Sequence, residues 1–545
     1  MATNWTPATV PNGPTDIATF GNSSTTNVSL STNTQVDRVV FSAAASAFNI
    51  ATPHAIIFTV SGAGIVNNSG ATQGFAVTPD PANPLGDLAR MVFTGNAAVG
   101  AAVELTTSGG VNGGGGSLVE FRDQSTPGNA LITNNGGIQN SAAGQTQFLD
   151  NSTAASATIE NKAVTDGGFS AGGLTAFFGS SSAGNASITN RALNGQNGAP
   201  GVTTFAENAS ADHANIVCEG ADNILGFGGA VDFLDNATAG NAQITLLAVS
   251  SRTSAAVKFL DNSSAGNATI IANGASGNGG IITFAGGDGG TARFVINRDA
   301  VLDASFPDDD GVNLGSVEGS GALFLGSNEI RIGTNNLSTA FNGTAADKVT
   351  GTHGSITKVG TGTLELRGDN LYSGNTTVEN GTLRVSNRKG SGTGTSVVEI
   401  NAGNLAGSGT IAGATTVGAG NGTRATLAPS AGVRQPARLT IQSMLTFKSD
   451  GSYTFMLNAR RAAADMVVAN GVTLESGAQF TLRAVALKRL PEGTSFTAIS
   501  NTSAEPINGT FANLPDGSTL VVGRNTFEAS YCGGDGNDLT LTVVP

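Results

Sequence analysis

The stretches FLDNATAGNAQI, residues 233–244, and FLDNSSAGNATI, residues 259–270, are near copies of one phrase. The phenylalanine that opens the phrase recurs at intervals of 28, 27, 29, 28, 28, 26 and 25 residues. It stands at Phe93, Phe121, Phe148, Phe177, Phe205, Phe233, Phe259 and Phe284. A repeat of about 20 to 50 residues is typical of a solenoid, a propeller or an array of small units. The sequence is therefore built from tandem repeats.

The spacing of apolar residues inside each copy is strict. Isoleucine stands eleven residues after the phenylalanine at Ile132, Ile159, Ile188, Ile216, Ile244 and Ile270. Alanine stands nine residues after it at Ala130, Ala157, Ala186, Ala214, Ala242 and Ala268. Between these fixed points lie Asn, Asp, Gly and Ser, which favour turns. We predict a strand, a turn and a second strand in each copy, with the phenylalanine, alanine and isoleucine columns facing inward.

The length and composition of the repeat favour a parallel β-helix. The units are rich in Gly, Asn and Thr and lack the apolar spacing of an amphipathic helix, which excludes helical repeats. A propeller blade needs roughly 40 to 45 residues, more than one unit offers. In a parallel β-helix each coil lies on the one before it, and equivalent side chains stack about 4.8 Å apart. We therefore predict an all-β parallel β-helix.

Identical residues in such a stack form ladders. Asparagine stands eight residues after the phenylalanine at Asn129, Asn185, Asn241 and Asn267, interrupted by Ser156 and His213. We predict an asparagine ladder along the axis at this position, joined by amide hydrogen bonds.

Composition and charge narrow the classes of function. The 545 residues include 77 glycines and only 12% charged residues, and the formal net charge is −13. An acidic chain without clustered Lys and Arg is a poor partner for nucleic acid. Neither a signal peptide nor an apolar run long enough to span a membrane is present in the given residues, which we expect to be soluble. Cys218 and Cys532 lie many rungs apart, and we expect both to be unpaired.

One stretch in the second half carries a family resemblance. From Gly354 the chain reads GSITKVGTGTLELRGDNLYSGNTTVENGTLRVSN, which resembles the autotransporter-associated β-strand repeat. The residues that match its pattern are Gly360, Gly362, Thr363, Leu364, Leu366, Gly368, Asn370, Tyr372, Gly374, Thr377, Val378, Gly381, Thr382 and Leu383. The start of the chain and residues 404–413, 426–432 and 531–544 are similar to other parts of such proteins. The resemblance is to the passenger part, without its translocator barrel, and it implies a right-handed β-helix of pectin-lyase-like or autotransporter-passenger architecture. It implies export and an extracellular or cell-surface location, with signal peptide and anchor outside the given residues.

These landmarks divide the chain into four expected segments. Residues 1–90 form an N-terminal cap and the first coils, and residues 91–300 form the tandem repeats. Residues 301–432 form coils of the autotransporter type. Residues 433–545 hold longer alternating strands that we expect to cap the open end, because an uncapped rung would expose a row of unpaired backbone groups.

Carboxylates on neighbouring rungs are the main candidates for chemistry. Acidic residues stand two positions after the phenylalanine at Asp123, Asp150, Glu207, Asp235 and Asp261. Asp235 and Asp261 would stack and repel each other unless hydrogen bonds or a cation relieved them. Their plainer interpretation is a turn cap on each rung. Asp308, Asp309 and Asp310 form a second acidic group, whose plainer interpretation is a solvated loop. Both groups are weak calcium candidates, and we expect no other metal and no cofactor.

Two further motif matches are weak. Residues 168–172 read G-F-S-A-G, which matches the nucleophile elbow G-x-S-x-G, but that motif needs a helix after the serine and no helix former follows. Residues 533–541 read GGDGNDLTL and approach a calcium-binding nonapeptide, although Thr540 fills its apolar position and no tandem copy exists. We interpret the first as a chance match and the second as a tight turn.

Two classes of function remain open. The first is a non-enzymatic extracellular β-helical rod that serves as an adhesin, a spacer or an envelope component. Its expected partners are glycans or proteins of cell surfaces or matrix, or further copies of itself, and its contacts would be multivalent. The second is a polysaccharide lyase or glycoside hydrolase that uses carboxylates on adjacent rungs. One Trp, three Tyr and few charges speak against the second class, so we expect no enzymatic activity and no catalytic residues.

Overall fold

The computed structural model describes residues 4–79, 88–164, 168–195, 197–222, 226–248, 254–306, 311–431, 433, 435–485 and 488–545. Contacts between Cα atoms divide the chain into two units, Met1–Val301 and Leu302–Pro545, and each is described by itself. All the regular elements named in the described residues are strands, β1 to β51, and most of them pair in parallel. The predicted all-β parallel solenoid is therefore confirmed.

One turn of the first unit shows how the repeat folds. Strand β10 (Leu118–Phe121) is followed by two tight turns and then by β11 (Leu131–Asn134). The turns place Asp123 and Gly128 in left-handed backbone, both with φ of 57°, which Asp tolerates better than most residues and Gly adopts freely. A loop then returns the chain to β12 (Gln145–Phe148), which pairs with β10 in parallel. One copy of the repeat therefore makes one rung.

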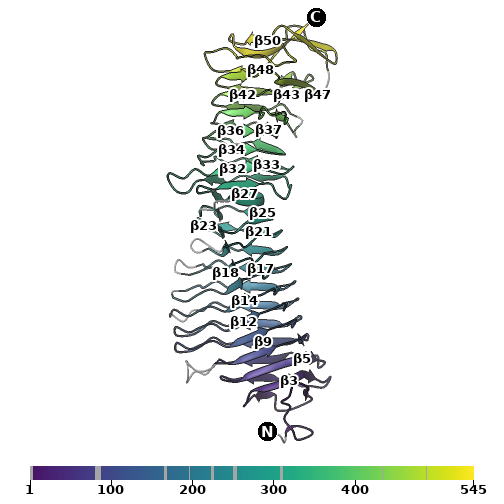
Figure 1. Ribbon diagram of the computed structural model, residues 1–545, viewed down its shortest axis with the longest axis vertical. Helices are drawn as coiled ribbons and strands as arrows, with labels where there is room; N and C mark the ends of the chain where they lie inside the picture. Colours follow the sequence, from purple (N-terminus) through teal and green to yellow (C-terminus); the bar gives the residue numbers. More distant parts are fainter. Residues whose placement is uncertain are drawn as a thin grey trace. The chain divides into compact units, whose positions relative to one another are not determined.

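Stacked rungs give the first unit two long columns of parallel strands (Figure 1). The first column runs through β1 (Ile17–Phe20), β3 (Thr34–Phe41), β5 (Ile57–Asn67), β7 (Arg90–Phe93), β10, β12, β14 (Leu174–Phe177), β16 (Val202–Phe205), β18 (Ala230–Phe233), β20 (Ala256–Leu260) and β24 (Ile281–Ala285). The second runs through β2 (Asn27–Ser29), β4 (Asn49–Thr52), β6 (Gln73–Val77), β9 (Val103–Thr107), β11, β13 (Thr158–Asn161), β15 (Ser187–Asn190), β17 (Asn215–Cys218), β19 (Gln243–Leu246), β21 (Thr269–Ala272) and β25 (Gly289–Ile296). A third ladder consists of single bridges, such as Thr153 to Ser182 and Ser182 to Ser210.

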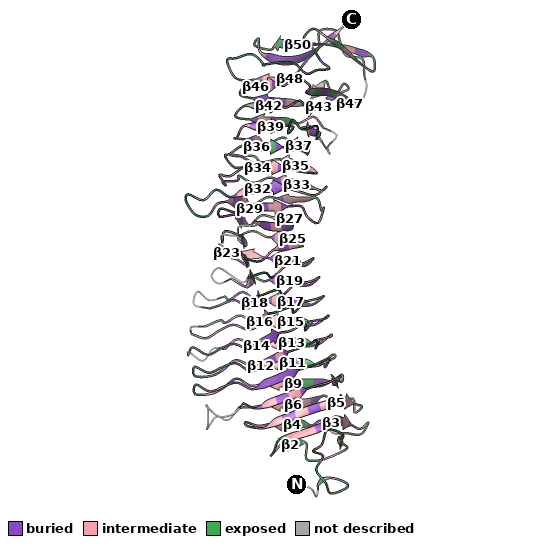
Figure 2. Cartoon of the chain, viewed as in Figure 1, coloured by how far each residue is buried: buried purple, intermediate pink, exposed green. Residues whose placement is uncertain are grey.

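The phenylalanine column forms the centre of the core. From Phe93 to Phe284 the rings stack with centroids 4.6–5.0 Å apart and planes within 13° of parallel. All eight side chains are at most 1% exposed. The strand repeat of about 4.8 Å sets the ring spacing, so the backbone register decides the stacking geometry. The alanine and isoleucine columns also lie inside, each at most 1% exposed, and Figure 2 shows the alternation of buried and open residues along the strands.

A column of buried polar side chains lies inside the first unit, at a position different from the predicted asparagine ladder. Asn134, Asn161 and Asn190 are fully buried at the ends of β11, β13 and β15. The Asn134 amide donates to Asn161 Oδ1 at 2.8 Å, and the Asn161 amide donates to Asn190 Oδ1 at 2.8 Å. Hydroxyls of neighbouring strands complete the network, for instance Thr175 to Asn161 Oδ1 at 2.8 Å. Cys218 ends the series, and burial raises the pKa of its thiol to about 12.

Loops on one side of the first unit form a second stack. Each loop is closed by a backbone bond near its ends, such as Gly144 N to the Asn135 carbonyl at 2.8 Å. Successive loops also bond to each other, for example Gly137 N to the Ala171 carbonyl at 2.9 Å. The loops lie one above another along the side of the strand stack in Figure 1. We call them the loop stack, represented by residues 108–117, 135–144 and the described part of 162–173.

The second unit continues the same principle with shorter rungs. One of its columns runs through β27 (Val312–Gly319), β29 (Glu329–Ile332), β32 (Ser355–Lys358), β34 (Thr376–Val378), β36 (Val398–Ile400), β39 (Thr415–Val417), β42 (Leu445–Phe447) and β46 (Val472–Leu474). The other runs from β27 through β30 (Thr339–Phe341), β33 (Thr363–Leu366), β35 (Thr382–Val385), β37 (Gly403–Gly407), β40 (Ala425–Leu427), β43 (Gly451–Asn458) and β47 (Gln479–Val485). Parallel pairing thus persists through most of this unit.

The parallel stack of the second unit ends in antiparallel strands. Strand β45 (Met466–Ala469) pairs in parallel with β48 (Ser495–Asn501). Beyond β48 the order is β51 (Asp538–Val544), β50 (Asn525–Gly533) and β49 (Thr519–Val522), all antiparallel. The chain turns back on itself here, so the backbone N–H and C=O groups of these strands bond to each other and not to a further rung.

Candidate groove on the first unit

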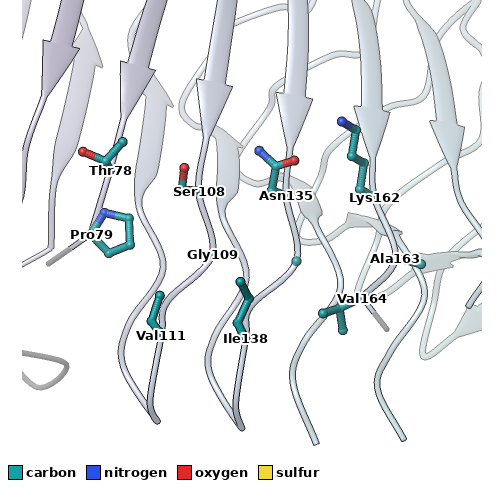
Figure 3. A pocket seen from close by; sticks show the side chains of 11 residues that line it. Thr78, Pro79, Ser108, Gly109, Val111, Asn135, Ile138, Lys162, Ala163 and Val164 are labelled. Atoms are coloured by element: carbon teal, nitrogen blue, oxygen red, sulfur yellow. The ribbon is translucent and has the colours of Figure 1, made fainter. Parts of the chain in front are cut away.

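A groove of about 660 Å³ runs beside the carboxyl ends of four stacked strands in the first unit. One wall consists of the residues that directly follow β6, β9, β11 and β13, namely Thr78, Ser108, Asn135 and Lys162. Backbone bonds hold three of them in register, because Ser108, Asn135 and Lys162 each donate to the previous rung at 2.9–3.1 Å. Figure 3 shows these four side chains in a row. The wall therefore offers one polar side chain per rung, at the strand repeat of about 4.8 Å.

The opposite wall is apolar and belongs mainly to the loop stack. Pro79, Val111, Ile138 and Val164 form a second row in Figure 3. Ile138 is 47% exposed, whereas Val164 is 7% exposed. Gly136 allows this close packing, because a Cβ there would lie 2.7 Å from the Val164 Cβ. The groove is thus a strip with hydrogen-bonding groups on one side and apolar groups on the other.

The electrostatic character of the groove comes from one residue. Lys162 is the only charged residue among those that line it. It is exposed and forms no ion pair among the residues that the structure describes. The Asn135 amide donates to the Thr107 carbonyl at 2.8 Å, which fixes its orientation along the axis. Such an arrangement can bind an extended ligand through several weak contacts, and its described lining residues include no carboxylate, histidine or cysteine.

The acidic column occupies turns of the first unit. Asp123, Asp150, Glu207, Asp235 and Asp261 all have left-handed backbone, with φ of 53–60°. Each carboxylate accepts the backbone N–H of the equivalent residue one rung earlier, for instance Asp235 N to Asp261 Oδ2 at 3.2 Å and Glu207 N to Asp235 Oδ2 at 2.9 Å. The turn-cap interpretation describes this geometry, except that each cap reaches across to the preceding rung. Asp235 and Asp261 stay untested as weak calcium candidates.

The second acidic group and the predicted asparagine ladder do not form a site among the described residues. Asp308, Asp309 and Asp310 lie outside the described residues. Asn129, Asn185, Asn241 and Asn267 are exposed in turns, and among described residues only Asn241 and Asn267 bond to each other, at 3.3 Å. The described residues contain no group of three or more His, Cys, Asp or Glu side chains suited to a metal ion.

The weak motif matches belong to ordinary structural features. Ser170 is 2% exposed in the loop stack, and β14 rather than a helix follows it. The geometry of a nucleophile elbow is therefore not formed at this serine. Residues 533–538 form the tight turn that joins β50 to β51, where Asp538 Oδ1 accepts the Asn501 N–H at 2.9 Å.

The groove residues were not predicted, because nothing in a single copy of the repeat marks them. A usable signal does exist, since Asn135 and Lys162 stand fourteen residues after Phe121 and Phe148. They directly follow the last inward side chain of each rung. A polar residue at this place in successive copies predicts a polar row at the edge of the strand column.

Comparisons with known proteins find one matching repeat family and one similar solved structure. A family model described as the passenger-associated transport repeat matches residues 356–385, the stretch of β32 to β35. No curated protein matches the sequence significantly. Among solved structures, the Haemophilus influenzae Hap adhesin is similar at 9% identity and a TM-score of 0.22, covering 95% of this chain and 64% of that one. None of the described residues forms a helix with the length and apolar character needed to cross a membrane. The chain is therefore a β-solenoid, similar to autotransporter passengers, that carries a passenger-associated transport repeat at residues 356–385.

Proposed function

We propose that this chain is an exported, non-enzymatic binding protein, an adhesin whose solenoid displays a repeated surface to ligands of other cells or the matrix. The observation that carries the proposal is the groove, in which four successive rungs each contribute a polar side chain and the facing wall is apolar. The passenger-associated transport repeat supports export to the cell surface or beyond.

The groove suits an extended ligand more than a compact one. Its polar groups recur at about 4.8 Å along the axis, so a chain-like ligand laid along it meets a polar side chain at each step. One such contact is weak, but several on one rigid scaffold add up through effective concentration. Linear glycans and extended protein segments both have this form, and we propose them as the ligand classes.

The test compares the wild-type chain with a groove variant on immobilised glycans and matrix proteins. Ile138→Gln combined with Lys162→Gln removes the exposed apolar group and the charge of the groove. Leu131→Gln combined with Lys258→Gln is the matched control, because it removes one exposed apolar group and one charge on the outer faces of β11 and β20.

We expect the groove variant to lose most binding and the control to keep it. Equal binding by the two variants would show that the groove is not the contact surface. Release of new reducing or unsaturated ends from polysaccharides by the wild-type chain would contradict the non-enzymatic assignment. If only further copies of the chain bind, the surface serves self-association and not adhesion.

A further inference from the structure

A second concave site lies within the second unit, on residues of the passenger-associated transport repeat and of the rungs before and after it. Its volume is about 550 Å³. It is lined by Asn342, Arg367, Asp369, Ser386, Arg388 and Lys389. Three cations and one carboxylate therefore meet at one place on a chain that has 26 basic and 39 acidic residues in all.

Three stacked strands position the back of this site. Asn342, Arg367 and Ser386 directly follow β30, β33 and β35, whose last residues pair in register. Arg367 N donates to the Phe341 carbonyl at 2.9 Å, and Ser386 N to the Leu366 carbonyl at 2.8 Å. The strand ladder thus fixes the three backbone positions one rung apart.

Arg367 is held in place by its neighbours. Its Nη2 donates to Glu365 Oε2 at 2.9 Å, and its Nη1 donates to Asn342 Oδ1 at 3.4 Å. Burial raises the pKa of Glu365, but hydrogen bonds from Arg367 and Ser386 outweigh it and hold this pKa below the usual value. Glu365 therefore stays ionised and offsets part of the Arg367 charge, which leaves Arg388 and Lys389 as the main source of positive potential.

The turn that carries Arg388 and Lys389 is rigidly built. Asn387 is 6% exposed, and its amide donates to the carbonyls of Lys389 and Gly390, both at 3.0 Å. Its Oδ1 accepts the Thr410 N–H at 2.8 Å, which ties the turn to the next rung. Gly390 has φ of 60°, and a Cβ there would lie 1.8 Å from Asp369 Oδ1, so no other residue fits without a shift.

The two cations on this turn have no partner of their own. Arg388 and Lys389 are exposed, and neither side chain forms an ion pair with any residue that the structure describes. The rigid turn fixes the backbone positions of both cations beside the cavity, so an anion that binds there orders only their side chains and not the turn itself. The planar guanidinium of Arg388 matches the two oxygens of a carboxylate or sulfate group.

The polar lining of the site indicates which class of molecule carries the anionic group. All six lining side chains are polar, whereas a protein partner would normally bury apolar or aromatic anchors. The Ser386 hydroxyl, the Asn342 amide and the Asp369 carboxylate offer both donors and acceptors, which suits a ligand with many hydroxyl groups. We propose that this site binds the carboxylate or sulfate group of an acidic polysaccharide. The site is separate from the groove, and the inference does not depend on the proposed role of the groove.

The test measures binding of the full chain to four probes: oligogalacturonate, which carries only carboxylates, dextran sulfate, which carries only sulfates, neutral dextran, and poly-glutamate. The site variant is Arg388→Gln with Lys389→Gln. The matched control is Arg460→Gln with Arg461→Gln, which removes two exposed charges from the same unit outside the site. Because both variants have the same net charge, non-specific attraction changes equally in each.

We expect the site variant to bind oligogalacturonate or dextran sulfate roughly ten times more weakly than the control, and with a shallower dependence on salt. The preferred probe shows whether the anion is a carboxylate or a sulfate. Equal affinity of the two variants would overturn the proposal, as would failure of the wild-type chain to bind either acidic glycan. Tighter, Arg388-dependent binding of poly-glutamate would assign the site to an acidic protein segment and reject the polysaccharide.

The proposals for the groove and for this site can be tested independently of each other. The groove variant Ile138→Gln with Lys162→Gln keeps Arg388 and Lys389, so it should keep its affinity for the acidic glycan. Loss of that affinity in the groove variant would mean that the acidic glycan binds at the groove, and would refute the assignment to the second unit.

Discussion

The buried asparagine column should contribute far more to stability than the exposed one. Asn161 is fully buried and makes four side-chain hydrogen bonds, with Asn134, Asn190, Thr175 and Thr203, at 2.8–3.2 Å. A neutral hydrogen bond contributes about 1 kcal/mol net, and a buried partner left unsatisfied costs about 1–3 kcal/mol. Asn161→Ala should therefore lower the free energy of opening of its rungs by about 4 kcal/mol.

The matched control is Asn241→Ala, the same substitution in the exposed column. Asn241 accepts one long bond from Asn267 at 3.3 Å and is open to water. Its loss should change stability by no more than about 0.5 kcal/mol. If the two Asn→Ala substitutions differ by several kcal/mol in their effect on stability, the difference comes from the burial of the side chain and the number of its hydrogen bonds.

Native-state hydrogen exchange is the suitable assay, because a solenoid is held by nearest-neighbour contacts and local opening is not masked by the rest of the chain. The amides of β11, β13 and β15 should lose protection in Asn161→Ala, while those of β24 and β25 keep it. Equal protection in the Asn161 and Asn241 variants would refute the argument that the buried amides bind the rungs together.

Three further outcomes are expected. Phe233→Asp places a charge between rings 4.9 and 5.0 Å away and should cost more than about 4 kcal/mol, so a variant with wild-type melting temperature would contradict the inward column. Burial lowers the pKa of Lys358 to about 8. The unfolded chain then binds more protons between pH 8 and 10.5, so stability should rise with pH in that window and the rise should be smaller in Lys358→Met, as measured by urea unfolding. Removal of calcium with a chelator should leave the melting temperature unchanged, because Asp235 and Asp261 already accept backbone N–H groups, and a clear decrease would indicate a bound ion.

The repeat spacing predicted the core because each rung is one copy and the copies differ little in their strands. Phe233 and Ile244 fall on fixed positions of the copy, and parallel pairing in register then places every equivalent side chain in one column. The buried Asn161 could also have been found, since it stands two residues beyond Ile159 and alternation places both on the same face. The asparagine ladder was predicted instead at the turn, for example at Asn241 and Asn267, because these asparagines lie within the phrase that recurs from copy to copy.

The site could not be predicted in the same way, because it depends on how loops approach the strands. The loops differ in length and in the residues near their tips, and the position of Ile138 beside Asn135 follows from backbone bonds between loops of different rungs. The same holds for Arg388 and Lys389, which are placed by the side chain of Asn387 and not by an alternating pattern.

The loop stack also explains how the copies differ in length. In the six copies that begin at Phe121 to Phe259 the isoleucine stands eleven residues after the phenylalanine, so the variation from 25 to 29 residues in these copies falls outside the two strands and their turns. Residues can be gained or lost in a loop without moving a single ladder partner. A whole copy can be duplicated or deleted by unequal recombination, since every copy brings its own core residues and caps, whereas a fraction of a copy would shift the register of all strands after it. This architecture therefore changes its length in whole rungs and its binding surface by single residues, two kinds of variation that selection can act on separately.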